Sequence, residues 1–137
     1  MKRCLAAIAL LALVSGLVMA QEGPAITFNK GLAECSYSNP LDKVWSAAVK
    51  TFMTQKPGKG GSWQGSPVRP DKTSNTMSGT WVVGKGLTQW AAELQLLFEE
   101  DGASTKIYCT VAVPGIGKKN REKVQTQFLA ALFEMLK

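Results

Sequence analysis

The sequence of 137 residues contains no histidine. This absence excludes Ser-His-Asp and Cys-His nucleophile systems, zinc sites with histidine ligands and histidine-based pH switches. A D-x-D-x-D-G calcium loop and a P-loop with its fixed glycine and lysine spacing are missing as well. We therefore expect a protein that is not an enzyme and that has no catalytic residue, metal site or cofactor.

Long apolar runs are also scarce. The one candidate is the uncharged stretch 4–20, which is 17 residues long and follows Lys2 and Arg3. A membrane-spanning helix needs about 20 apolar residues, whereas a basic start, a short apolar run and small residues before Ala20 are typical of a secretion signal. We predict that residues 1–20 are a signal peptide cleaved after Ala20. The protein would then be periplasmic or secreted, without a transmembrane segment; an uncleaved anchor is the alternative.

The composition predicts one small globular domain. Removing 20 residues leaves 117, and losing Lys2 and Arg3 takes two positive charges from a net +6, leaving +4. Hydrophobic residues make up 45% and charged residues 19% of the chain, which is enough apolar material for a core. We expect a short N-terminal segment at 21–30 and a single domain at 31–137. The mild positive charge permits, without requiring, an anionic partner.

Residue periodicity predicts the secondary structure. Alternating apolar and polar residues predict strands at 31–38, 77–84, 88–100 and 105–113, although helix formers compete in the third. Three- and four-residue apolar spacing predicts helices at 41–55, with Asn39 as its cap and Pro40 as its first residue, and at 120–136.

These elements predict an α+β fold. It is a two-layer sandwich in which an antiparallel sheet of about four strands carries two helices on one face, in the order β-α-β-β-β-α. The other sheet face is polar enough to meet water. It carries Glu34, Ser36, Ser78, Thr80, Gln89, Glu93, Gln95, Lys106 and Thr110.

Cysteine is scarce in the mature chain. Three are present in all, and Cys4 would leave with the signal. Cys35 and Cys109 both fall on apolar strand faces, and two cysteines in an oxidising compartment predict one disulfide bond. Two separate buried thiols are the alternative.

Two basic segments are the candidate binding sites for an anion or a partner. Residues 56–76 are rich in glycine and proline and predict an irregular basic loop. The second segment is the turn that precedes the last helix, where backbone N–H groups can receive a phosphate or carboxylate. The candidate residues are Lys56, Lys59, Trp63, Arg69 and Lys72 in the loop, and Lys118, Lys119 and Arg121 in the turn. A solvated surface loop and a solubilising turn are the plainer interpretations.

Carboxylate catalysis finds little support. Glu93 and Glu99 fall on one face of a predicted strand, six residues apart. At about 3.4 Å per residue they lie too far apart for a glycosidase pair.

One resemblance stands out. The run SYSNPLDKVWSAA at residues 36–48, with TMSGT at 76–80, resembles small bacterial envelope domains of β-α-β-β-β-α order. Such domains occur in uncharacterised exported proteins and in lipoprotein subunits of the outer-membrane protein assembly machinery. The resemblance covers roughly residues 31–136, but the chain departs from the lipoproteins because no cysteine directly follows its apolar run. It implies no catalytic residue.

The expected function follows from these points. The leading hypothesis is an exported, non-enzymatic structural or protein-interaction module with a partner in the cell envelope. The alternative is a binding module for an anionic lipid or envelope polymer through the two basic segments, and a small hydrolase is the third. Export makes nucleic acid a poor partner.

Overall fold

The computed structural model describes residues 23–55, 68–83, 90–112 and 117–137. Its elements are β1 (Ile26–Asn29), β2 (Leu32–Tyr37), α2 (Leu41–Thr54), β3 (Arg69–Asp71), β4 (Thr76–Val83), β5 (Trp90–Asp101), β6 (Ser104–Val111) and α3 (Lys118–Met135). The predicted signal peptide lies outside these residues. No helix in the described ranges is both long enough and apolar enough to cross a membrane.

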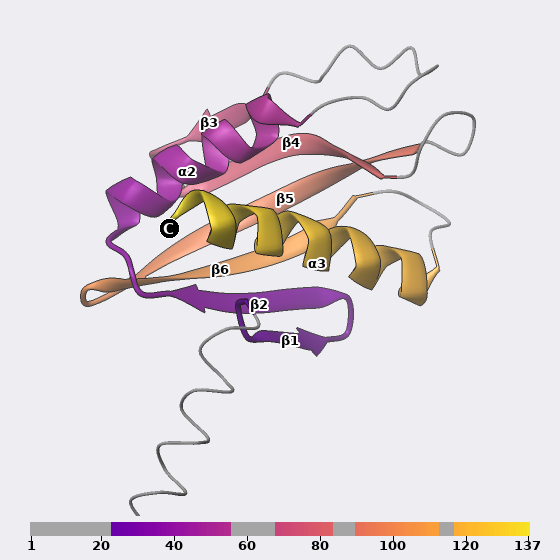
Figure 1. Ribbon diagram of the computed structural model, residues 1–137, viewed down its shortest axis with the longest axis horizontal. Helices are drawn as coiled ribbons and strands as arrows, with labels where there is room; N and C mark the ends of the chain where they lie inside the picture. The colour runs from indigo at the N-terminus through magenta and orange to yellow at the C-terminus, as the bar shows by residue number, and fades with distance from the viewer. Residues whose placement is uncertain (1–22, 56–67, 84–89, 113–116) are drawn as a thin grey trace, which may run out of the picture.

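The strands form one antiparallel sheet in the order β1-β2-β6-β5-β4-β3. Both helices lie on the same face of this sheet, with β1 and β3 at its two margins (Figure 1). The last strand, β6, pairs with β2 on one side and β5 on the other, so it joins the N-terminal hairpin to the rest of the sheet. The α+β class and the two helices on one face are confirmed.

The sheet has six strands where about four were expected. The two additional strands are the marginal ones: β1 lies within the predicted N-terminal segment, 21–30, and β3 within the predicted loop, 56–76. They have four and three residues, too few for an alternating pattern to stand out. Pro70 in β3 also counts against a strand, because proline cannot donate to a sheet ladder. The stretch 56–67 of the predicted loop lies outside the described residues.

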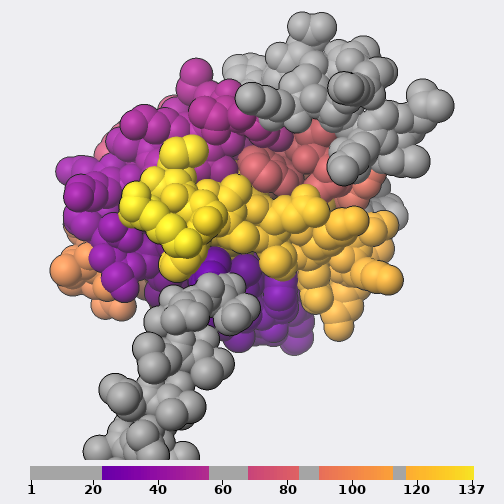
Figure 2. All heavy atoms as spheres, viewed as in Figure 1, coloured from indigo at the N-terminus to yellow at the C-terminus, as the bar shows by residue number. Residues whose placement is uncertain are grey.

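The core lies between the sheet and the two helices. Every second residue of β5 points into it, as the alternation predicted, and Ala92, Leu94, Leu96 and Phe98 are all buried. Phe128 of α3 meets Phe52 of α2 with 4.5 Å between ring centroids, and Trp81 of β4 edge-on at 5.4 Å. Aromatic contacts of this kind add to the burial of apolar area, so this cluster holds both helices to the sheet. Figure 2 shows α3 lying along this face with α2 beside it.

Two buried polar side chains tie α3 to the strands beneath it. The Tyr37 hydroxyl donates a hydrogen bond to the carbonyl of Leu129 at 2.8 Å. The Gln125 amide nitrogen donates to the carbonyls of Gly31 at 2.9 Å and Cys109 at 2.8 Å. Each such bond contributes about 1 kcal/mol net, but an unmade one in the core costs more. These bonds therefore fix the position of α3 on the sheet.

The ends of α2 are attached to neighbouring strands. The cap position is Pro40 rather than Asn39, and no side chain caps the helix. Asn39 was expected to cap the helix with its side chain. Instead its backbone carbonyl accepts a hydrogen bond from the Thr105 hydroxyl at 2.9 Å. At the other end, the Gln55 side-chain oxygen accepts a hydrogen bond from the Val82 N–H at 2.9 Å. Both contacts fix the helix to the sheet.

The cysteines are both buried free thiols, so the predicted disulfide bond is not formed in the structure. They lie on neighbouring strands as expected, but the register pairs Cys109 with Ala33 and Cys35 with Ile107. The two cysteines are therefore diagonal neighbours, with Cα atoms about 7–8 Å apart, whereas a disulfide joins Cα atoms at about 4.4–6.8 Å. Burial raises the pKa of both thiols, which favours their neutral form.

Candidate functional site: the open face of the sheet

The sheet face opposite the helices, which we call the open face, carries ordered rows of side chains, because cross-strand partners in a sheet point the same way. One row runs from β2 to β3 through Glu34, Tyr108, Leu97, Thr76 and Asp71. The next row runs from β6 to β3 through Thr110, Gln95, Ser78 and Arg69. The expected polar character of this face is thus largely present.

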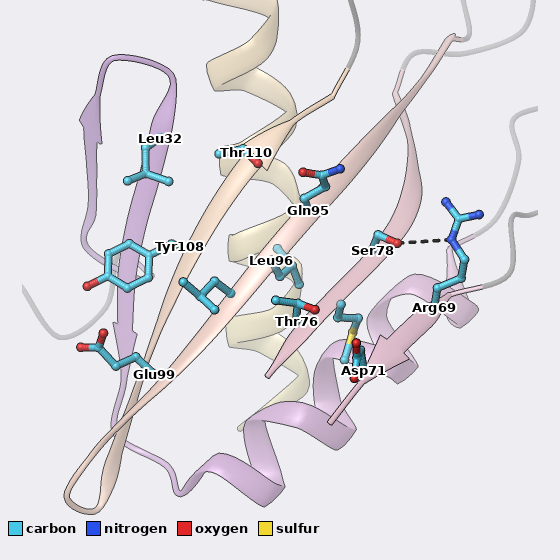
Figure 3. Close-up of a pocket in the computed structure, with 12 residues that line it drawn as sticks. Leu32, Arg69, Asp71, Thr76, Ser78, Gln95, Leu96, Glu99, Tyr108 and Thr110 are labelled. Atoms are coloured by element: carbon cyan, nitrogen blue, oxygen red, sulfur yellow. Dashed lines mark hydrogen bonds between the residues drawn. The ribbon is translucent and has the colours of Figure 1, made fainter. Parts of the chain in front are cut away.

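A hollow of about 830 Å³ lies over these rows. Figure 3 shows Tyr108, Gln95 and Thr110 on the near side of the sheet, with the helices behind it. Part of its lining is apolar: Leu97 is 44% exposed and stands in register beside the half-buried Tyr108. The hydroxyl of Thr76 borders this apolar part. An exposed leucine in a hollow surrounded by hydrogen-bonding groups is suited to contact with another molecule.

The basic side chains of the open face are already paired. Arg69 forms an ion pair with Glu93, and its Nε lies 3.4 Å from the Ser78 hydroxyl. The Lys106 ammonium lies 3.1 Å from the carboxylate of Glu34. The hydrogen bond to Glu34 is the main reason why the pKa of Lys106 is raised. Both cations are thus neutralised within the sheet.

Two carboxylates that line the hollow lack such a partner. Within the described part of the chain, neither Asp71 nor Glu99 has a basic side chain within 4 Å. Glu99 stands in register with Lys106, whose ammonium contacts Glu34 instead. Figure 3 shows Asp71 and Glu99 on opposite sides of the hollow. The hollow is therefore locally negative, although the chain as a whole carries a net +6.

Arg69 and Lys72, the described site residues of the predicted basic loop, contact different parts of the molecule. Arg69 points to the open face, whereas the Lys72 ammonium lies 3.5 Å from the Asp42 carboxylate and 4.9 Å from the centre of the Trp45 ring, both on α2. An acidic partner thus compensates each of the two charges. The other three predicted members, Lys56, Lys59 and Trp63, lie outside the described residues.

The second basic segment forms the first turn of α3. Lys118 and Lys119 are exposed, while the Arg121 side chain packs over Gly31, 3.5 Å from where a Cβ on that glycine would lie. This turn lies at the opposite end of the molecule from β3 (Figure 1). The structure therefore does not bring Arg69 and Lys72 together with the turn.

Sequence reasoning missed Leu97 and the hollow around it. Strict alternation along β5 requires a polar residue at 97, between the inward Leu96 and Phe98, and the sequence has leucine there. That break in the pattern was the available signal. The hollow itself has no counterpart in the alternation.

Comparisons with known proteins give structural likeness only. Neither a scan of protein-family models nor a search of curated proteins gives a match. Among solved structures, the chain is similar to CalU16 from Micromonospora echinospora. The CalU16 crystal structure is 17% identical, with a TM-score of 0.48 over 85% of this chain and 82% of that one. Its solution NMR structure is 15% identical, with a TM-score of 0.42 over 82% and 73%.

At this level of similarity CalU16 carries no inference about the function of the chain. It also gives no support to the resemblance with envelope domains drawn from residues 36–48. That resemblance stays a prediction.

Proposed function

We propose that this protein is a non-enzymatic protein-interaction module that binds its partner on the open face of the sheet. The observation that carries the proposal is the hollow of about 830 Å³ lined by the exposed Leu97. The hollow combines the exposed Leu97 and the half-buried Tyr108 with hydrogen-bonding side chains, a mixture that suits a binding surface.

The chemistry of the hollow favours a basic, extended segment of a partner protein. Leu97 and Tyr108 offer apolar contact, and neighbouring hydroxyl and amide groups offer hydrogen bonds. Asp71 and Glu99 supply negative charge, and neither forms an ion pair with a described basic residue. A segment that alternates apolar and basic side chains matches both properties, because complementary charge favours the right partner and speeds its association.

The arrangement of the acids supports the non-enzymatic part of the proposal. Glu93 and Glu99 are on one strand about 20 Å apart at 3.4 Å per residue, much further than a glycosidase pair requires. Glu93 is also engaged by Arg69. In the described ranges, no three side chains of the metal-ligating types come together.

The cellular setting of the proposal rests on the sequence alone. The layout of residues 1–20 supports export to the periplasm or beyond, and the partner would then be a protein of the cell envelope.

A binding module for an anionic lipid or polymer is the second candidate. The exposure of Lys118 and Lys119 in the first turn of α3 favours it, because that turn has unpaired backbone N–H groups as well. This candidate predicts salt-sensitive binding to vesicles of anionic phospholipid, lost when Lys118, Lys119 and Arg121 are replaced by alanine.

An NMR titration with two matched peptides tests the first candidate. One peptide alternates lysine and leucine, and the other has glutamate in place of each lysine. We expect only the lysine peptide to shift the amide signals of β4, β5 and β6 near Leu97. Added salt should weaken the binding of this peptide.

Two variants make the test specific to the open face. Leu97→Glu should abolish peptide binding, whereas Met53→Glu, which changes an exposed apolar residue on α2, should leave it unchanged. Equal binding of both peptides, or signal shifts confined to the helices, would contradict the proposal.

A further inference from the structure

The two margins of the sheet differ in how they are protected. β3 has only three residues, Arg69–Asp71, of which two are charged and the third is proline. Short length, charge and proline are the usual means by which proteins prevent a sheet edge from pairing with another chain. β1 has the sequence ITFN, with neither charge nor proline, and its Phe28 is 36% exposed. β1 is also short, with four residues, but it lacks the charge and the proline of β3, so it is the less protected of the two edges.

The hairpin after β1 determines which backbone groups of this edge face outward. Its two-residue turn, Lys30 and Gly31, has positive φ at both positions, as in a type I′ turn. Such a turn closes on a hydrogen-bonded pair, here Asn29 with Leu32. Because hydrogen-bonded and non-bonded pairs alternate along the ladder, Thr27 also bonds to β2. The N–H and C=O groups of Ile26 and Phe28 point away from the sheet.

This pattern is complementary to itself. When two β1 strands run antiparallel with Thr27 opposite Thr27, Ile26 of each copy stands opposite Phe28 of the other. All four outward residues then pair, giving four hydrogen bonds, whereas a register shifted by two residues gives two. Ile26 and Phe28 are in register with the core-facing Cys35 and Ala33. Each exposed Phe28 ring would therefore pack beside Ile26 of the other copy on the helix side of the joined sheet.

We propose that two copies of this chain associate through their β1 edges, around a twofold axis that passes between the two Thr27 residues. The contact is smaller than the standard protein interface of about 1,600 Å², so the dimer is weak and its population depends on concentration. Its consequence is one continuous sheet with the two open faces on the same side.

Cysteine cross-linking tests the register directly. In a Cys4→Ser background, Thr27→Cys places two thiols at a non-hydrogen-bonded pair with Cα atoms about 4.5 Å apart, suited to a disulfide bond. Asn29→Cys is the matched control: it is exposed on the same strand and face, but its counterpart in the other copy lies about 13 Å away. Mild oxidation should give a covalent dimer for Thr27→Cys and little for Asn29→Cys. Equal cross-linking of both variants, or of neither, would overturn the proposal.

Sedimentation velocity over a wide range of protein concentration gives an independent measurement. The average mass should rise with concentration, and Phe28→Lys should abolish the rise, because it places a charge on each edge. Met53→Lys introduces the same charge at an exposed site on α2 and should leave the rise unchanged. Circular dichroism checks that both variants are folded. A protein that stays monomeric at the highest concentration refutes the dimer.

Discussion

Phe52 of α2 lies so close to Gly79 of β4 that a Cβ on the glycine would approach a ring carbon within 2.7 Å. Gly79 is buried and its φ is not positive, so the requirement for glycine comes from space and not from backbone conformation. The same Phe52 ring stacks on Phe128 of α3 at 4.5 Å. One missing side chain in the sheet thus permits both helices to approach it.

Gly79→Ala should lower the free energy of unfolding. The added methyl group forces the Phe52 ring and the helix outward, and overpacking of this kind costs about 1–3 kcal/mol. Gly117→Ala is the control for space alone, since nothing lies within 4 Å of its Cβ position; its own smaller loss comes from the α3 N-cap, where glycine is preferred to alanine. Urea denaturation measures both variants, and Phe52→Leu combined with Gly79→Ala should recover part of the loss. A neutral Gly79→Ala would contradict the close approach.

Leu97 and Phe98 are neighbours with opposite environments, and substitutions should separate them. Leu97→Ser changes an exposed side chain and should alter the free energy of unfolding by less than about 0.5 kcal/mol. Phe98→Ala empties a core position, where Phe98 contacts Trp45 at 4.9 Å between ring centroids, and should cost about 3–5 kcal/mol. Thermal or urea denaturation compares them. Similar costs for the two variants would mean that the register of β5 is different.

The cysteines should be chemically silent in the folded protein. Burial raises the pKa of both Cys35 and Cys109, so little thiolate is available to an alkylating reagent. Without any reductant, iodoacetamide should leave both residues unmodified in the native state and modify both after denaturation. Mass spectrometry of the two cysteine-containing peptides provides the measurement. Two residues that remain unmodified after denaturation would show that the disulfide expected from the sequence does form.

Stability should fall at alkaline pH. Burial, followed by the neighbouring Cys35, raises the pKa of Tyr37 above its ordinary value of about 10. The folded state then retains a phenolic proton that the unfolded chain releases, so this stabilisation is complete below about pH 10 and decreases as pH rises further. Cys35 and Cys109 act in the same direction from about pH 8.5.

Urea unfolding at a series of pH values from about 8 to 11 measures this dependence. Tyr37→Phe should cost about 1 kcal/mol at neutral pH through the lost bond to Leu129, and should make the decrease above pH 10 shallower. A free energy of unfolding that does not decrease over this range contradicts the burial of the three groups.

The sequence was informative wherever a residue pattern was long. The twelve residues of β5 kept their alternation against a strong helix propensity, and both helices were located from their apolar spacing. β1 and β3 were missed because three or four residues cannot establish a period. The cysteines show a subtler limit. Their common face follows from alternation, but a diagonal pair and a directly opposed pair differ only by a register shift of two, which leaves every side chain on its own face.

The open face illustrates why the candidate site could not be derived in full. Its polar rows follow from alternation, but their order across the sheet depends on β6 lying between β2 and β5. Pairing between distant strands decides that order, and it is what places Tyr108 beside Leu97 on one side and Glu34 on the other. The basic loop and the basic turn were expected to act together at one binding site, because nothing in the sequence gives the distance between them.

The position of β6 also has a consequence for the order in which the chain folds. β3, β4, β5 and β6 pair with their neighbours in sequence, whereas β2 pairs with β6 through partners such as Ala33 and Cys109, 76 residues apart. Closing so long a loop is entropically slow. We expect the C-terminal meander to assemble first and the N-terminal hairpin to dock last. A chain that emerges N-terminus first, from a ribosome or a translocation pore, must therefore keep the outer side of its first hairpin unpaired until β6 has followed, when almost the whole domain is out.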